Sequence, residues 1–167
     1  IQTWSSAVAD FDNDGDMDII ITASAGNHHF FKNNLDTSNS IEETFTEITS
    51  GSGWDTNSST NIDNIAYDFD NDGLTDMALH NQRLPDGPAM QVFRNSSNTT
   101  SLSFGLAGTY AGGLKSTGGL SSGDLNGDGK ADIIAIGQTG VPDSIVVFRN
   151  TTATAGQTSF DARVNLT

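Results

Sequence analysis

The stretch Asp10-Phe-Asp12-Asn-Asp14-Gly15-Asp16-Met-Asp18 decides the fold, because the chain repeats its pattern twice more. The second copy is Asp68-Phe-Asp70-Asn-Asp72-Gly73-Leu74-Thr-Asp76, and the third is Asp124-Leu-Asn126-Gly-Asp128-Gly129-Lys130-Ala-Asp132. Each copy carries oxygen-bearing side chains at positions 1, 3, 5 and 9 and Gly at position 6. Oxygens with this spacing converge on one centre of a tight loop, and Gly allows the sharp turn that the loop needs.

A set of oxygen donors of this kind fits a hard divalent cation. Calcium takes six to eight oxygens at roughly 2.3 to 2.6 Å and tolerates irregular geometry better than magnesium does. We therefore expect three calcium sites, and the alternative is an Asp-rich turn that binds no ion. The third should be the weakest, because Asn126 replaces an acid at position 3. The expected ligands are the side chains of Asp10, Asp12, Asp14, Asp18, Asp68, Asp70, Asp72, Asp76, Asp124, Asn126, Asp128 and Asp132, with the backbone carbonyls of Asp16, Leu74 and Lys130.

The residues that follow each loop exclude a helical EF-hand. An EF-hand loop needs Glu at position 12, where this chain has Ile21, Leu79 and Ala135. Short apolar, partly β-branched runs over residues 18–22, 76–80 and 132–136 instead predict strands buried on both faces. The composition, rich in Gly, Ser, Thr and Asn, also favours an all-β fold with many turns.

The repeat extends beyond the loops. Each unit has an aromatic residue, a basic residue and Asn in succession, at residues 31–33, 93–95 and 148–150, and then a Phe-centred strand, at residues 44–48, 102–106 and 159–164. Each unit therefore has four expected strands. Lys32, Arg94 and Arg149 recur at one position, so we expect them to be structural and to pair with loop carboxylates.

The loops recur after 58 and then 56 residues. Four-stranded units with a period of roughly 40 to 50 residues, lengthened by loops, are typical of β-propeller blades. Gly- and Ser-rich stretches over residues 51–60 and 105–119 predict the boundaries. We expect blade 1 over residues 1–52, blade 2 over 53–110 and blade 3 over 111–167.

These motifs resemble the FG-GAP and VCBS repeat family, whose members are calcium-binding blades of β-propellers, as in integrin α-subunits, some fungal lectins and large secreted proteins. The resemblance implies three four-stranded antiparallel blades with calcium at the quoted loops. A propeller ring has at least about four blades. Three blades therefore imply closure by further blades of a longer chain, by a closed oligomer, or by stacking into a filament.

Charge and composition exclude several other classes. The net charge is −14, but twelve of the eighteen Asp lie in the three loops, so most of the acidity belongs to the expected metal sites. Seven scattered Lys and Arg provide no basic stripe for nucleic acid, and no apolar run approaches the ~20 residues of a membrane span. No Cys is present, so bound metal could supply the cross-links that disulfides often give secreted proteins. Because the chain begins at Ile1 without a signal peptide, we expect a piece of a longer precursor.

The compartment is indicated by five Asn-x-Ser/Thr glycosylation acceptors, at Asn57, Asn95, Asn98, Asn150 and Asn165. Glycosylation requires a secretory route, and calcium loops suit calcium-rich extracellular fluid. An extracellular location, secreted or at the cell surface, is therefore expected.

The function expected from the sequence is a non-enzymatic, extracellular, calcium-binding repeat module with a structural or adhesive role. No Ser-His-Asp or Cys-His set stands out, and the metal loops use nearly all the paired carboxylates. The alternatives are a lectin, with Trp54, Tyr67 and Tyr110 as a sugar-stacking platform, and a non-catalytic appendage of a larger secreted enzyme. Expected partners are calcium, further blades or a second copy, and a glycan or extracellular protein.

Overall fold

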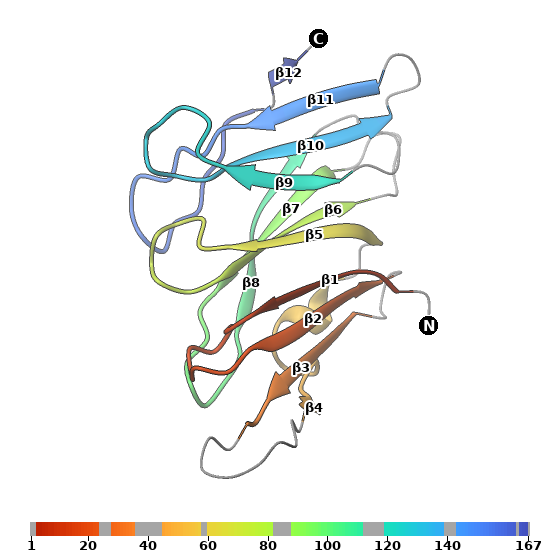
Figure 1. The fold of residues 1–167 in the computed structure, drawn as a ribbon, viewed down its shortest axis with the longest axis vertical. Coiled ribbons are helices and arrows are strands. Elements are labelled where there is room, and N and C mark those ends of the chain that lie inside the picture. Colours follow the sequence, from red (N-terminus) through yellow and green to blue (C-terminus); the bar gives the residue numbers. More distant parts are fainter. Residues whose placement is uncertain are drawn as a thin grey trace.

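Three four-stranded antiparallel sheets stack along the long axis of the computed structural model (Figure 1). The structure describes residues 3–23, 28–35, 45–57, 60–81, 88–111, 119–138, 143–162 and 164–166. The only helical segment among them is the short 3-10 turn η1 (Trp54–Thr56). The prediction of an all-β chain with three four-stranded blades is therefore confirmed.

The strands of each blade lie in the sheet in the order in which they occur in the chain. Blade 1 contains β1 (Thr3–Ala9), β2 (Asp18–Ala23), β3 (His29–Asn33) and β4 (Phe45–Glu47). Blade 2 contains β5 (Asn61–Tyr67), β6 (Asp76–Asn81), β7 (Pro88–Asn95) and β8 (Phe104–Ala111). Blade 3 contains β9 (Leu120–Gly123), β10 (Asp132–Gln138), β11 (Asp143–Phe148) and β12 (Val164–Leu166).

The Asp-rich loops join the first two strands of every blade. Pairing of these strands ends at Ala9 with Asp18, at Tyr67 with Asp76 and at Gly123 with Asp132. Each loop thus begins directly after a strand and ends with the Asp that opens the next one. All three loops lie along the same side of the stack, on the left in Figure 1.

Two apolar cores fill the seams between neighbouring blades. Side chains alternate between the two faces of a strand, so each blade has a front face, toward the next blade in the chain, and a back face, toward the preceding one. Phe11, Ile20 and Phe30 on the front of blade 1 pack against the back of blade 2. The front of blade 2 meets the back of blade 3 in a second cluster that includes Phe69 and Phe148. Blade 2 is therefore covered on both faces.

Three details of the sequence prediction are wrong. Residues 105–111 were expected to be a linker but belong to β8, which ends one residue past the expected boundary at 110. The last strand of blade 3 is β12, not residues 159–164, and Phe160 makes only an isolated bridge with Asn150. Trp54 cannot belong to a sugar platform, because it is fully buried against Phe93 and Phe104 in the first seam.

Candidate metal centre

The first Asp-rich loop is held in shape by its own side chains. One oxygen of Asp10 accepts a hydrogen bond from the backbone N–H of Asp14 at 3.1 Å, and the other accepts one from Gly15 at 3.0 Å. Gly15 has φ of 100°, and Asn13 at position 4 has φ of 61°. The second loop repeats this pattern with Asp68, Asn71 and Gly73. The left-handed residue at position 4 is a feature that the sequence prediction missed.

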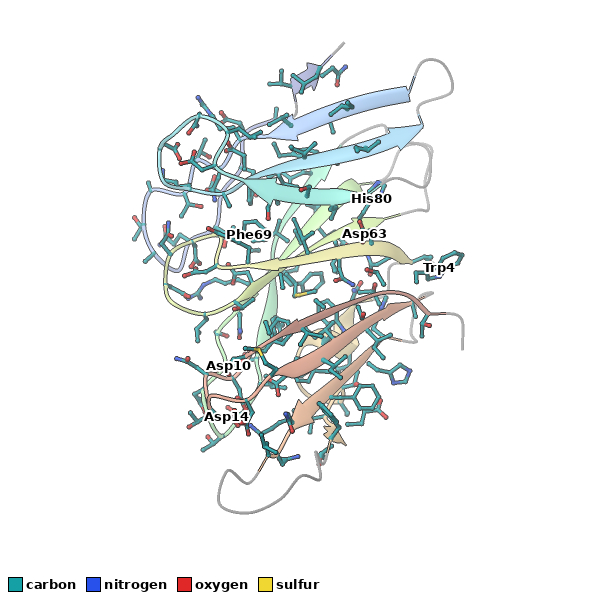
Figure 2. The ribbon with its side chains drawn as sticks, viewed as in Figure 1. Trp4, Asp10, Asp14, Asp63, Phe69 and His80 are labelled. Carbon is teal, nitrogen blue, oxygen red and sulfur yellow. The ribbon has the colours of Figure 1, made fainter. Side chains whose placement is uncertain are left out.

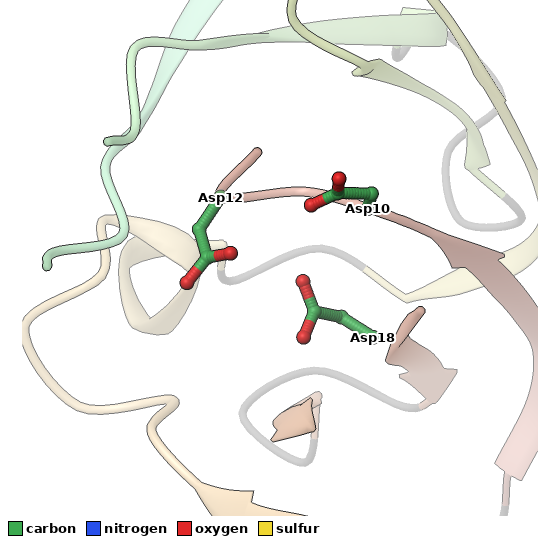
Figure 3. A group of neighbouring side chains, drawn as sticks. All are labelled: Asp10, Asp12 and Asp18. Atoms are coloured by element: carbon green, nitrogen blue, oxygen red, sulfur yellow. The ribbon is translucent and has the colours of Figure 1, made fainter. Parts of the chain in front are cut away.

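In each of the first two loops three carboxylates converge. Asp10, Asp12 and Asp18 each offer an oxygen, and these oxygens lie within 4.8 Å of one another (Figure 3). Asp68, Asp70 and Asp76 form the equivalent group. Carboxylates this close repel each other strongly unless a cation or a proton intervenes. Hard oxygen donors in this arrangement fit a calcium ion, and because Asp12 and Asp18 are buried, an ion bound there would be partly shielded from water.

The Asp at position 9 also fastens the loop to the sheet. Asp76 accepts hydrogen bonds from the backbone N–H groups of Phe69 at 3.1 Å and of Asn95 in β7 at 2.8 Å. Asp18 and Asp132 accept the equivalent pairs. Burial raises the pKa of Asp76 to about 7, and repulsion from Asp70 and Asp72 adds to the rise, although both backbone hydrogen bonds oppose it. Burial also raises the pKa of Asp18.

The recurring basic residue pairs with loop carboxylates in blades 1 and 2, as predicted. Lys32 Nζ donates to Asp12 and, at 2.6 Å, to Asp14 Oδ2. Arg94 donates to Asp70 at 3.1 Å and to Asp72 at 2.7 Å. Burial lowers the pKa of Lys32, but the two hydrogen bonds outweigh it and raise this pKa to about 12. Asp14 and Asp72 therefore face a cationic side chain and lie outside the two convergent groups of three.

In the third blade the recurring basic residue does not pair with the loop. Arg149 was expected to pair with its loop but pairs with Asp161 at 3.0 Å. Position 3 is Asn126, whose neutral amide donates to Asp128 at 3.1 Å, so this position offers the arginine no carboxylate of the kind that Asp12 and Asp70 provide. Hydrogen bonds from the backbone of Gly129 and its neighbours lower the pKa of Asp124. No group of three converging acids occurs in this loop within the part of the chain that the structure describes.

A buried amide connects each of blades 2 and 3 to the loop of the blade before it. The Nδ2 of Asn95 donates to the backbone carbonyl of Phe11 at 2.7 Å and to that of Thr75 at 2.9 Å, while its Oδ1 accepts from Ser97 N–H at 2.9 Å. Asn150 repeats all three bonds, reaching the carbonyl of Phe69 at 2.8 Å. We call Asn95 and Asn150 the clamp residues. Sequence reasoning missed this role, although the Asn after the basic residue of every unit was a usable signal.

The clamp contradicts two of the expected glycosylation sites. Asn95 and Asn150 are buried, and their amide nitrogens already donate to two carbonyls, so neither can carry a glycan in this fold. Asn57 is also buried, with its Nδ2 bonded to Asn61 at 2.8 Å. Asn98 and Asn165 are exposed. Only these two of the five acceptors remain open to modification.

Asp63 joins the three blades at the end opposite the loops (Figure 2). One oxygen accepts from Ser5 Oγ in β1 at 3.1 Å, and the other accepts from the backbone N–H of Leu120 in β9 at 2.7 Å. The Asp-rich loops and Asp63 thus fix opposite ends of the seams. Asp63 therefore has a structural role, linking blade 2 to both of its neighbours.

Repeated four-stranded blades with Asp-rich first turns define a β-propeller-type repeat module. Residues 3–38 and 117–157 match the FG-GAP repeat, and residues 68–135 match the FG-GAP-like repeat. The chain belongs to the FG-GAP repeat family. No curated protein matches the chain. FG-GAP repeats are generally non-catalytic, occur in extracellular or surface proteins and often bind calcium. None of the described residues forms a helix long and apolar enough to span a bilayer.

Proposed function

We propose that this chain is a calcium-stiffened, non-catalytic, extracellular repeat module with a structural or adhesive role. The observation that carries the proposal is the convergence of Asp10, Asp12 and Asp18, repeated in the second loop by Asp68, Asp70 and Asp76. Positions 1, 3 and 9 of the motif therefore converge in both of these loops. Calcium is the occupant that suits several carboxylates in a flexible loop, whereas magnesium demands near-ideal octahedral geometry.

A cation at the first loop would tie three strands together. Asp10 follows β1, Asp18 opens β2, and Asp18 also accepts the backbone N–H of Asn33 at the end of β3. Binding to the folded state alone stabilises it by mass action. The expected consequence is a blade that is rigid with calcium and looser without it.

A structural role for the cation follows from how the carboxylates are used. The position-9 Asp accepts two backbone hydrogen bonds, and Asp12 is held by Lys32. Such a site holds a cation but leaves little room for a substrate. Extracellular calcium modules work at high calcium concentrations, and the exposed acceptor Asn98 is compatible with a secretory route.

Calcium titration of the chelated protein by calorimetry, together with thermal unfolding, tests the proposal. Asp68→Asn removes one negative charge while its Oδ1 can still accept the loop hydrogen bond from Asp72, so one site should lose about tenfold or more in affinity. Asp161→Asn, outside the loops, is the matched control and should bind calcium normally. An unchanged melting temperature after chelation, or equal affinity in both variants, would contradict the proposal.

A second candidate, carbohydrate binding, rests on two equivalent pockets at the seams. The first, of about 270 Å³, lies beside Lys32 and Asp12, and the second, of about 320 Å³, lies beside Arg94. Hydroxyl groups of Ser and Thr line both. A glycan array in millimolar calcium discriminates the two functions: reproducible binding to one sugar family favours the lectin, and a blank array favours the scaffold.

A further inference from the structure

Asn126 is followed by Gly127, and no other Asn in the chain precedes a Gly. Both residues are exposed in the third Asp-rich loop. Asn before Gly is a chemically labile pair, because the backbone nitrogen of the second residue can attack the side-chain amide of the first, and Gly has no side chain to obstruct the attack. Asn126 stands at position 3 of the motif, where the other two loops have Asp12 and Asp70. The labile amide therefore lies at the position where the third loop lacks an acid.

The loop places suitable groups on both reacting parts of this pair. The N–H of Gly127 donates to Asp124 Oδ1 at 2.7 Å, so a carboxylate is in place to accept the proton of the attacking nitrogen. The Oδ1 of Asn126 accepts a hydrogen bond from the backbone N–H of Asp128 at 2.9 Å. This bond polarises the amide carbon and stabilises negative charge on the oxygen during the attack.

The surroundings of Gly127 are open. A Cβ added to Gly127 would meet nothing within 4 Å, so water has access to this side of the loop. Gly127 has φ of 79°, close to the values of 61° and 56° at Asn13 and Asn71, which occupy the same position 4 in the first two loops. The left-handed backbone of this position is thus shared by all three loops, whereas the Asn-Gly pair occurs in the third alone.

We propose that Asn126 is a spontaneous deamidation site, and that its conversion gives the third loop the acid it lacks at position 3. A bond forms between the Gly127 nitrogen and Asn126 Cγ, the Cγ–Nδ2 bond breaks, and the Nδ2 group leaves as ammonia with the proton from the Gly127 nitrogen. The product is a cyclic succinimide, which water then opens. Water attack at Cγ restores the original backbone and leaves Asp, whereas attack at the backbone carbonyl carbon leaves isoaspartate.

The Asp product has a direct consequence for the third loop. It carries acids at positions 1, 3 and 9, the positions at which three carboxylates converge in the first two loops. Calcium affinity depends on the number of charged ligands, so the third loop should bind calcium about tenfold more tightly after conversion to Asp. The isoaspartate product shifts a side-chain carbon into the backbone, which disturbs the spacing of the loop. This consequence rests on the proposed calcium function, whereas the deamidation itself does not.

Calcium should slow the conversion. An ion in the third loop would engage Asp124, which otherwise accepts the proton, and would fix the Oδ1 of Asn126. Peptide mapping by mass spectrometry, during incubation at neutral pH in chelator and in millimolar calcium, measures the replacement of the amide NH2 by OH. Asn126 should convert in both samples, and faster in chelator. No conversion at Asn126, or faster conversion in calcium, overturns the proposal.

Asn98 is an internal control in the same samples. It is also exposed, and its Oδ1 likewise accepts backbone hydrogen bonds, from Thr100 at 3.0 Å and from Ser101 at 3.1 Å. It is followed by Thr99, whose branched side chain obstructs the attack that Gly127 permits. Asn98 should therefore stay intact while Asn126 converts, and equal conversion of the two residues would overturn the assignment.

A matched variant tests the role of the glycine. Gly127→Asn introduces the residue that the first two loops carry at position 4 with positive φ, so the loop backbone can be kept while a side chain now obstructs the attack. Asn126 should then remain intact over the period in which the original protein converts. Conversion at an unchanged rate would show that the Asn-Gly pair is not the cause.

The effect on calcium is measured by calorimetry on freshly prepared protein and on Asn126→Asp, which reproduces the Asp product. The third site of the variant should be about tenfold tighter. An unchanged third affinity overturns the gain that the conversion is expected to bring. Absence of calcium binding at every loop would instead refute the proposed function, and the mass change at Asn126 would still be observed, so the two failures are distinguishable.

Discussion

Replacing the clamp residue Asn95 by Ala should destabilise the seam between blades 1 and 2. Asn95 is 0% exposed, and its side chain makes three hydrogen bonds, to the carbonyls of Phe11 and Thr75 and from the N–H of Ser97. Ala removes all three and leaves backbone groups unpaired in the interior.

The magnitude follows from the number of bonds. A buried hydrogen bond contributes a net of about 1 kcal/mol, and an unsatisfied buried partner costs about 1 to 3 kcal/mol. The free energy of unfolding should therefore fall by about 3 kcal/mol. Asn98→Ala is the control, because exposed Asn98 bonds only within its own turn and should cost at most about 1 kcal/mol.

Urea unfolding in excess calcium, followed by tryptophan fluorescence, measures both variants. Trp54 is a suitable reporter because it is buried in the affected seam, with its ring 5.4 Å from that of Phe93. If Asn95→Ala costs no more than Asn98→Ala, the amide does not hold the blades together and the reasoning is refuted.

Three further outcomes are expected. In the calcium-free protein, the raised pKa of Asp76 contributes to the free energy of unfolding below about pH 4, and this contribution is lost as the pH rises through about 7. Urea unfolding in chelator should therefore show a more stable protein in mild acid than at neutral pH. Equal stability at the two pH values would contradict this. Gly53→Ala should destabilise far more than Gly51→Ala, because φ is positive at both but only at Gly53 would the new Cβ lie 1.9 Å from a carbonyl oxygen, that of Phe104; equal melting temperatures would contradict it. Terbium luminescence should resolve two tight sites and a weaker third, since Asn126 leaves loop three without a group of three acids, and three equal sites would refute the ranking.

The blades could be predicted from the sequence because short local motifs define each repeat. The loop motif fixes where two strands join, and the shared Phe-basic-Asn run fixes the third strand, so the count of four strands was accessible without any knowledge of packing. The pairing of Lys32 and Arg94 with their loops followed from the same recurrence.

What the sequence could not show depends on position in the stack. The three apolar runs after the loops look alike, yet residues 77–80 of blade 2 are all buried, whereas residues 18–22 of β2 alternate between buried and half-buried. The difference arises because only blade 2 has a neighbour on both faces. For the same reason Asn95 and Asn150 matched a glycosylation motif, since a local pattern does not reveal that the preceding blade supplies a carbonyl.

The clamp has a consequence for how the loops respond to one another. Phe11 uses its N–H to hold Asp18 of its own loop and its carbonyl to hold Asn95, whose own N–H binds Asp76 of the next loop. A continuous series of hydrogen bonds therefore runs from one group of acids to the next, and Phe69 and Asn150 extend it to Asp132. We expect a loop that distorts after losing its cation to displace the acceptor of its neighbour, so the blades should loosen in sequence along the stack and not independently.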